Sequence, residues 1–299
     1  MAKPRELRRR IKSVQSTRKI TKTMELVATS KLKRAQDRVV AARPYAAALA
    51  EVIGDLYAPE LAERFPLLRQ PAAGGGARRR VALVVITANR GLCGAFNANL
   101  IREARRRIEQ LEGEGAGVDL HLIGKKGITY FKYAKRTAAS QRSDIGDKPK
   151  AEHAVEIVGP LMTQFASGAL DAVEVVFAQF KSAVSTPPTT LRILPITPPR
   201  ADPKGRPGGR GRAVNYILKP SAEAILEQLL PLYVRNQLYR ALVETAAAFL
   251  GAQRTAMKNA TDNAGDIIEL LQRTYNRARQ AQITQELAEI VGGAEALKG

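Results

Sequence analysis

LYVRNQLYRALVETAAAFLGAQRTAMKNATDNAGDIIELLQRTYNRARQAQITQELAEIVGGAEALKG, from Leu232 to Gly299, decides the fold because it contains no proline. Sixty of these residues in one helix would reach about 90 Å, which exceeds the diameter of a small domain. Ser221, with Glu223 in the first turn, predicts the helix start. Pro231 is expected to interrupt the opening turns. Such a helix must pair with another helix or protrude.

The apolar face of this helix is thin. Heptad steps from Leu238 predict a seam of small and polar side chains, formed by Leu242, Thr245, Phe249, Ala252, Ala256, Asn259 and Asn263. Such a seam weakens pairing but lets two helices approach closely, so it predicts a slim rod. Gly251 and Gly265 are each expected to cost about 1 kcal/mol relative to alanine.

A second long helix is predicted at the other end of the chain. Proline and glycine are absent from residues 5–43, and Pro4 suits a first helical turn. Pro44, Gly54 and Pro59 are expected to allow bending and then termination. Three apolar sets have helical spacing, with a slip between Val14 and Ile20 that predicts an irregular supercoil: Leu7, Ile11 and Val14; Ile20, Met24 and Val27; Leu32, Ala35, Val39 and Ala42.

Strand and helix patterns alternate between these two helices. Apolar β-branched runs predict strands at 81–87, 118–124, 173–180 and 190–196, and helical patterns occupy 97–112, 125–134 and 152–167. The sequence therefore predicts an α/β domain with a mainly parallel sheet, inserted between two long terminal helices that form an antiparallel coiled coil. The expected parts are 1–58 (N-terminal coiled-coil helix), 78–197 (Rossmann-like α/β domain that binds no nucleotide), 198–213 (flexible Arg/Gly/Pro loop) and 214–299 (C-terminal coiled-coil helix).

Charge is concentrated at the N-terminus. The formal net charge is +20, and residues 1–43 hold 14 Lys/Arg against 3 Asp/Glu, so a partner of this segment should be acidic. With Cys93 as the single cysteine, an intrachain disulfide is impossible. The sequence has neither an apolar run long enough for a transmembrane helix nor an apolar signal core at its start.

One glycine-rich motif could carry chemistry. TANRGLCGAFNANLI, from Thr87 to Ile101, follows the first predicted strand and opens a helix, as a phosphate-binding loop would. Its glycine spacing does not fit G-x-G-x-x-G, which favours a tight strand-to-helix turn with Asn97 near the helix start. His121, His153 and Cys93 are isolated, and we expect no catalytic, cofactor-binding or metal-binding residues.

Two other functions remain open from residue patterns alone. The basic N-terminal helix could bind nucleic acid, although its charges lack interleaved aromatic residues. The α/β domain could be an enzyme that binds a nucleotide. Salt-dependent filter binding tests the first function, and calorimetry with nucleotide tests the second.

Three segments together resemble the gamma subunit of F-type ATP synthases. These are RRRIKSVQSTRKITKTMELVATSKLKRAQ (8–36), RGLCGAFNANL (90–100) and AMKNATDNAGDIIELLQRTYNRARQAQITQELAEIVGGAEAL (256–297). The resemblance implies a non-catalytic rotor subunit without cofactors. Its implied partners are the alpha and beta subunits of the catalytic hexamer, the epsilon subunit and the c ring, with no nucleic acid and no membrane span. It also implies a peripheral position on the cytoplasmic face of a bacterial plasma membrane, and contacts with a beta subunit through Lys22, Thr23, Met24, Gln280, Thr284 and Glu286.

The sequence departs from the family pattern at two positions. Asn89 stands where relatives usually carry Asp, so an ion pair made by that acid in relatives is not expected here. Gln253 stands where relatives often carry Arg, which should loosen a local contact. After Pro195 the chain lacks the two-cysteine segment of chloroplast relatives, which excludes that form of thiol regulation.

Overall fold

The computed structural model describes residues 4–56, 64–70, 79–196 and 221–296. The predicted loop at 198–213 lies outside the described residues. The chain divides into two compact units. We call residues 31–252 the body, and residues 1–30 together with 253–299 the paired end.

The elements of the body follow the predicted alternation. In chain order they are α1 (Pro4–Leu56), the 3₁₀ helix η1 (Pro66–Leu68), β1 (Arg80–Ile86), α3 (Phe96–Gly113), β2 (Gly117–Ile123), α4 (Lys125–Tyr133), β3 (Ser140–Arg142), α5 (Ala151–Ala166), β4 (Ala172–Ala178), β5 (Pro188–Leu194) and α6 (Ala222–Ala296). Both terminal helices, α1 and α6, continue from the body into the paired end.

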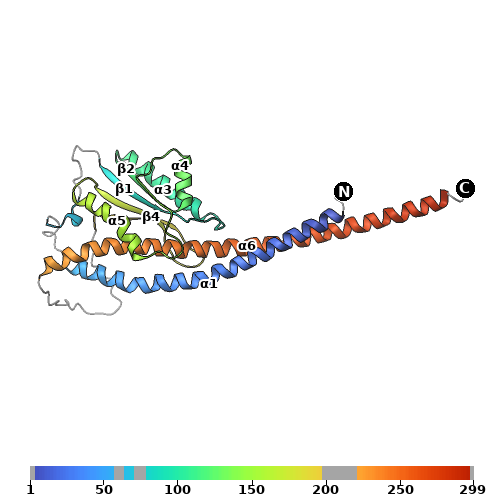
Figure 1. The fold of residues 1–299 in the computed structure, drawn as a ribbon, viewed down its shortest axis with the longest axis horizontal. Helices are drawn as coiled ribbons and strands as arrows, with labels where there is room; N and C mark the ends of the chain where they lie inside the picture. Colours follow the sequence, from blue (N-terminus) through green and yellow to red (C-terminus); the bar gives the residue numbers. More distant parts are fainter. Residues whose placement is uncertain (1–3, 57–63, 71–78, 197–220, 297–299) are drawn as a thin grey trace. The chain divides into compact units, whose positions relative to one another are not determined.

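The sheet is mainly parallel, as predicted. Its strand order is β3-β2-β1-β4-β5, and only β5 is antiparallel to its neighbour. Helices α3 and α4 cover the face that carries Leu83 and Val85, and α5 covers the face that carries Val84 and Ile86 (Figure 1). α6 contributes to both, with residues 226–242 on the α5 side and residues 243–250 on the α3 side. Strand β1 is buried on both faces because helices cover the two sides, which explains its continuous apolar sequence. The short strand β3 was not predicted, since its sequence SQR is polar.

Neither long helix is broken by proline. Helix α1 runs through Pro44 to Leu56, and α6 runs through Pro231, so the predicted interruption at Pro231 is wrong. A proline loses one backbone hydrogen bond. Leu230 and Val234, on either side of Pro231, are buried in the core, and this packing offsets the loss. The predicted cap is confirmed, because the backbone N–H of Ala224 donates to Ser221 Oγ at 3.2 Å.

Both terminal helices contribute to the core of the body. Leu32, Ala35 and Val39 of α1 share a cluster with α6 residues 243–250, and Leu49 and Ile53 pack with α6 residues 226–242. Later residues of α1 therefore meet earlier residues of α6, which is the antiparallel arrangement.

Gly251 of α6 has a packing role in the body. A Cβ there would lie 3.0 Å from the carbonyl oxygen of Ala183 in the segment between β4 and β5. Gly251 therefore lets the backbone of α6 approach Ala183 closely, in addition to carrying the helix cost expected from the sequence.

The paired end is an antiparallel coiled coil. Thr261 Oγ1 donates to Thr21 Oγ1 at 2.8 Å, and one turn further along α6 a Cβ on Gly265 would lie 3.8 Å from Arg18 Nε. Small and polar side chains therefore occupy this part of the seam, in agreement with the slim rod that was predicted, while the larger Leu7, Met257 and Ile268 are buried elsewhere along it. Figure 1 shows α6 continuing past the start of α1 within this unit, and every described side chain from Arg279 to Ala294 is exposed.

The predicted seam was wrong in part of each helix. On α1, Ile20 is 60% exposed and Val27 is 50% exposed, while Thr21 is half-buried and Ala28 is buried. The heptad runs without a slip from Leu7 to Ile53, because Arg18, Thr21 and Glu25 occupy its steps. The irregular supercoil was predicted because the apolar residues were traced along the helix instead of the seven-residue repeat.

On α6 the predicted register holds from Leu238 to Phe249 and then fails. Asn259 and Asn263 are exposed, and the buried positions are Met257, Thr261, Ala264 and Ile268. The eight-residue step from Phe249 to Met257 shifts the seam by one position. A straight helix has 3.6 residues per turn, so strict seven-residue steps drift away from the buried face.

Candidate interaction surface on the paired end

The paired end turns large apolar side chains outward. On α1, Ile20 and Leu26 are each 60% exposed. On α6, Ile283, Leu287 and Ile290 are exposed, the last to 68%. Exposed apolar residues that recur along one unit mark a surface for a protein partner, because water contact with them is unfavourable. Sequence reasoning missed Ile20 as a surface residue because it was assigned to the seam, and it gave Leu26 no role.

The predicted contact residues of α1 lie next to this apolar surface. Lys22 and Thr23 are exposed, and Met24 is half-buried. Lys22 Nζ pairs with Glu25 Oε2 at 3.1 Å, and Thr23 Oγ1 donates to the Lys19 carbonyl at 3.0 Å. The three side chains lie on successive positions of one helical turn, so they cannot all face one direction.

The predicted contact residues of α6 lie in its last turns. Gln280, Thr284 and Glu286 are exposed. Thr284 Oγ1 donates to the Gln280 carbonyl at 3.0 Å, and Gln282 Nε2 donates to Glu286 Oε1 at 2.8 Å. These bonds lie within the helix, so Gln280 keeps its side-chain amide, and Glu286 keeps its second oxygen, for a partner.

A second cluster of motif residues surrounds the loop after β1 in the body. Asn97 Oδ1 accepts a hydrogen bond from the Ala88 backbone N–H at 3.0 Å, which folds the loop back onto the start of α3. Leu92 and Gly94 have positive φ values of 60° and 58°. The motif therefore forms the tight turn that its spacing favoured.

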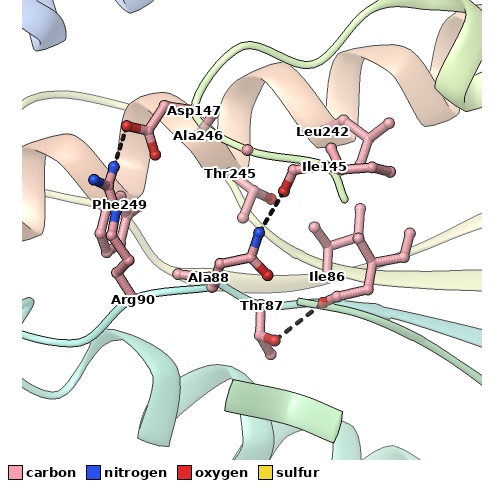
Figure 2. A pocket seen from close by; sticks show the side chains of 13 residues that line it. Ile86, Thr87, Ala88, Arg90, Ile145, Asp147, Leu242, Thr245, Ala246 and Phe249 are labelled. Carbon is pink, nitrogen blue, oxygen red and sulfur yellow. Dashed lines mark hydrogen bonds and ion pairs between the residues drawn. The ribbon is translucent and has the colours of Figure 1, made fainter. Parts of the chain in front are cut away.

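α6 covers this loop. Leu242, Thr245 and Phe249 of α6 line a cavity of about 40 Å³ together with Thr87 and Arg90 (Figure 2). Pockets for small ligands are roughly 300–1,000 Å³. The backbone N–H groups of Ala178 and Phe180 donate to Thr245 Oγ1 and Glu244 Oε2, so α6 occupies the carboxyl end of the sheet.

Asn89 pins a second segment beside this cavity. Its Nδ2 donates to the carbonyl oxygens of Ser143 and Ile145 at 2.9 and 2.8 Å, and its Oδ1 accepts from the Lys125 backbone N–H at 2.9 Å. The Lys125 N–H fixes the orientation of the amide, since a donor must meet the oxygen. Asn89 therefore does what an aspartate cannot do, because a carboxylate has no donor for two carbonyl groups.

We expect Asn89→Asp to destabilise the body by about 1–3 kcal/mol, because the carbonyl oxygens of Ser143 and Ile145 would lose their donor and face a carboxylate. Urea unfolding followed by circular dichroism measures the loss, and hydrogen exchange of residues 143–147 should rise. Asn99→Asp is the matched control, since Asn99 Oδ1 only accepts from Arg102 at 3.3 Å. Equal stability of Asn89→Asp and the wild type would contradict this role.

The remaining candidates from the sequence have local structural partners. His121 Nδ1 lies 2.7 Å from Ser140 Oγ, and burial lowers the pKa of the His121 imidazole. The Lys150 backbone N–H donates to His153 Nδ1 at 3.2 Å, at the start of α5. Burial raises the pKa of the Cys93 thiol, which makes the reactive thiolate scarce.

Comparison with known proteins decides the family. A family model described as ATP synthase matches residues 3–297. The chain is 62% identical over 299 residues to the ATP synthase gamma chain of Gemmatimonas aurantiaca, with all of both chains covered. The chain belongs to the ATP synthase gamma chain family. It is also 44% identical over 298 residues to the family member of Moorella thermoacetica, again over the whole of both chains.

Chains of two ATP synthase structures are similar in fold to this chain. In the Euglena gracilis mitochondrial ATP synthase structure of OSCP, F1 and c-ring, one chain matches with a TM-score of 0.65 and 19% identity, over 98% of this chain and 94% of that one. A chain of the Tetrahymena thermophila central stalk and c-ring structure matches with a TM-score of 0.57 and 21% identity, over 81% and 99%. At this level of sequence identity, the two matches show a shared fold. Among the described residues of this gamma chain family member, the helices are too short or too polar to cross a membrane.

Proposed function

We propose that this chain is the central-stalk rotor of an F-type ATP synthase. It couples ion-driven rotation of the membrane c ring to conformational change at the catalytic beta subunits, where ATP is synthesised or hydrolysed. Its proposed partners are the alpha and beta subunits, the epsilon subunit and the c ring. It would lie peripherally on the cytoplasmic face of a bacterial plasma membrane. Membership of the gamma chain family supports this proposal.

One observation about the paired end carries the mechanical part of the proposal. Thr21, Ala28, Thr261 and Ala264 lie in the seam beside the larger Met257 and Ile268, and the large apolar side chain of Ile20 faces outward. A helix pair with small seam residues is thin, which suits a shaft inside a ring of larger subunits. Its outward apolar residues suit contact with that ring.

The predicted contact residues suit angle-dependent attraction. Lys22 lies in the basic N-terminal segment, and Gln280, Thr284 and Glu286 supply donors and acceptors on exposed turns of α6. A charged surface attracts an acidic partner without deep interlocking. Tight binding at a single angle would trap the shaft, so weak contacts are required for rotation.

We propose further that the chain has no catalytic site of its own. The 40 Å³ cavity at the carboxyl end of β1 is far below the volume of a nucleotide pocket, and α6 lines it. Calorimetry of the isolated chain with ATP should therefore give no saturable heat. Saturable nucleotide binding would favour an enzyme instead, and tight salt-sensitive binding to DNA would favour a nucleic-acid protein.

Reconstitution tests the proposed function. Alpha and beta subunits are purified and assayed for ATP hydrolysis with and without this chain. Co-purification with a stable hexamer, together with a change in hydrolysis rate, is the expected result. Failure to join the hexamer would overturn the rotor assignment.

Removal of residues 286–299 should weaken torque and leave the body folded. The described side chains from Arg279 to Ala294 are exposed, so their loss removes partner contacts rather than core contacts. The unfolding free energy should change by less than about 1 kcal/mol, since exposed residues contribute little. Torque is measured by rotation of a bead on the reconstituted complex, and stability by thermal circular dichroism. Unfolding of the body in this variant would contradict the separation of roles.

A further inference from the structure

Asp147 joins three parts of the body. It lies between β3 and α5, and its carboxylate pairs with Arg90 in the loop after β1 (Figure 2). The same carboxylate lies 3.4 Å from Lys31 Nζ of α1. Arg38, two turns further along α1, donates through Nη1 to the Asp147 carbonyl oxygen at 3.5 Å. A single residue thus receives contacts from two positions on α1.

The segment that carries Asp147 is held firmly on the body. Ile145 is buried in the core, and Asn89 donates to the carbonyl oxygens of Ser143 and Ile145. Arg90 in turn lies over the Phe249 ring of α6, 6.0 Å from its centroid. The acid therefore has a fixed position, and its side chain is only 25% exposed.

The apolar contacts of α1 in this region resist separation better than sliding. Leu32, Ala35 and Val39 face the core, and two of these three are small or β-branched residues with little surface relief. Hydrophobic attraction depends on buried area and has no direction. A charge pair with a fixed partner, by contrast, favours one register of a helix, as polar seam residues do in coiled coils.

We infer that Asp147 is a positioning residue that holds residues 31–56 of α1 at one register and one rotation against the rest of the body. Turning force that enters the body then passes into both helices of the coil, rather than through α6 alone. This inference rests on the proposed rotor function. Without the carboxylate, Lys31 and Arg90 would repel each other, so α1 would slip under load.

Asp147→Asn tests the charge and keeps the backbone contact with Arg38. The assembled ATP synthase is placed in vesicles, and ATP hydrolysis without a gradient is compared with ATP synthesis at increasing ion gradients. Hydrolysis should stay within about twofold. The ratio of synthesis to hydrolysis should fall about three- to fivefold, because the variant loses the two partly exposed ion pairs of Asp147, and such pairs are individually weak. The deficit should grow with load, which reduced folding alone would not produce.

Three further variants serve as controls for this result. Asp147→Glu keeps the charge and should restore the ratio of synthesis to hydrolysis. Glu152→Gln removes one acid from the nearby start of α5, where its side chain is 77% exposed, and should leave the ratio unchanged. Lys31→Gln removes the same contact from the α1 side and should reproduce the load-dependent loss.

A distance measurement on the isolated full chain is independent of the assembled complex. Spin labels replace the exposed Lys33 of α1 and Thr163 of α5 in a Cys93→Ala background. Asp147→Asn should broaden the distribution of distances between the labels, and Asp147→Glu should not. Unchanged distances and an unchanged ratio would overturn the inference. If the wild-type chain fails to support hydrolysis or synthesis, the proposed function fails, and the spin-label result still judges the role of Asp147.

Discussion

Arg107→Met should destabilise the body by about 2–4 kcal/mol at neutral pH, because it leaves a buried carboxylate without its main cationic partner. Glu174 of β4 is 2% exposed. Arg107 of α3 holds it in two bonds, Nε to Oε2 at 2.6 Å and Nη2 to Oε1 at 2.7 Å. Arg192 of β5 adds two weaker bonds to Oε1, at 3.2 and 3.1 Å, which is why the loss stays below that of a fully unpaired charge.

The loss should depend on pH in a defined direction. Burial raises the pKa of Glu174, and the hydrogen bonds from Arg107 and then Arg192 more than offset this, so the pKa lies below its ordinary value. In the wild type this pair adds stability above about pH 4, and the contribution disappears as pH falls through the lower folded pKa. In Arg107→Met burial has less opposition, so the pKa of Glu174 rises. The difference in unfolding free energy should therefore shrink as the pH approaches 4.

Urea unfolding at pH 7 and at pH 4, followed by circular dichroism, measures both effects. Arg106→Met is the matched control, since Arg106 lies on the same helix, pairs with Glu103 and is 64% exposed. It should cost about 1 kcal/mol or less. The double variant Arg107→Met with Glu174→Gln should recover part of the loss, because the buried charge is then absent. A deficit that is equal at both pH values would show that packing, not charge, explains the effect.

Gly124→Ala should destabilise the body by about 3–5 kcal/mol, because it combines backbone strain with a steric clash. Gly124 lies between β2 and α4 with φ of +98°. A Cβ there would lie 2.1 Å from the carbonyl oxygen of Thr87, which is backbone and cannot rotate away. Thr87 is itself fixed, since its Oγ1 donates to the Ile123 carbonyl and accepts from the Gly127 N–H.

Gly159→Ala is the control for Gly124→Ala. Gly159 lies inside α5, and a Cβ there would meet nothing within 4 Å. It should change stability by less than about 1 kcal/mol, because the helix preference of alanine is opposed by the ring of the following Pro160. Thermal unfolding of both variants gives the comparison. Equal stability of Gly124→Ala and Gly159→Ala would mean that the turn after β2 can move away from Thr87. This would contradict the tight packing between Gly124 and the Thr87 carbonyl.

The Gly124 turn and Arg107 differ in how far the sequence could reveal their roles. GKKG, from Gly124 to Gly127, is a close-packed turn, and its glycines admit the Thr87 side chain and carbonyl. Arg107 was one of several arginines on α3 that the sequence could not distinguish. Its role depends on Glu174 and Arg192, which come from two other strands. Pairing of residues so distant in the chain leaves no local pattern.

The candidate surface was predictable in part. Lys22, Thr23, Met24, Gln280, Thr284 and Glu286 came from the family resemblance, and their contacts with a partner stay a prediction. Their exposure follows from the structure, with Met24 half-buried. The outward position of Ile20 could have been found by keeping the heptad from Leu7 through polar residues. Following the apolar residues instead led to the wrong face.

Sequence alone determined the kinds of element and their order, because each depends on local patterns. The proline-free run after Pro231, the unbroken segment before Pro44 and the alternation of residues 81–196 lead to two long helices and an inserted α/β domain. Tertiary structure decided which faces of those helices are buried and which charges meet. Seam register depends on the partner helix, and Asn89, Asp147 and Glu174 acquire their roles only when distant segments bring acceptors and cations within a few ångströms.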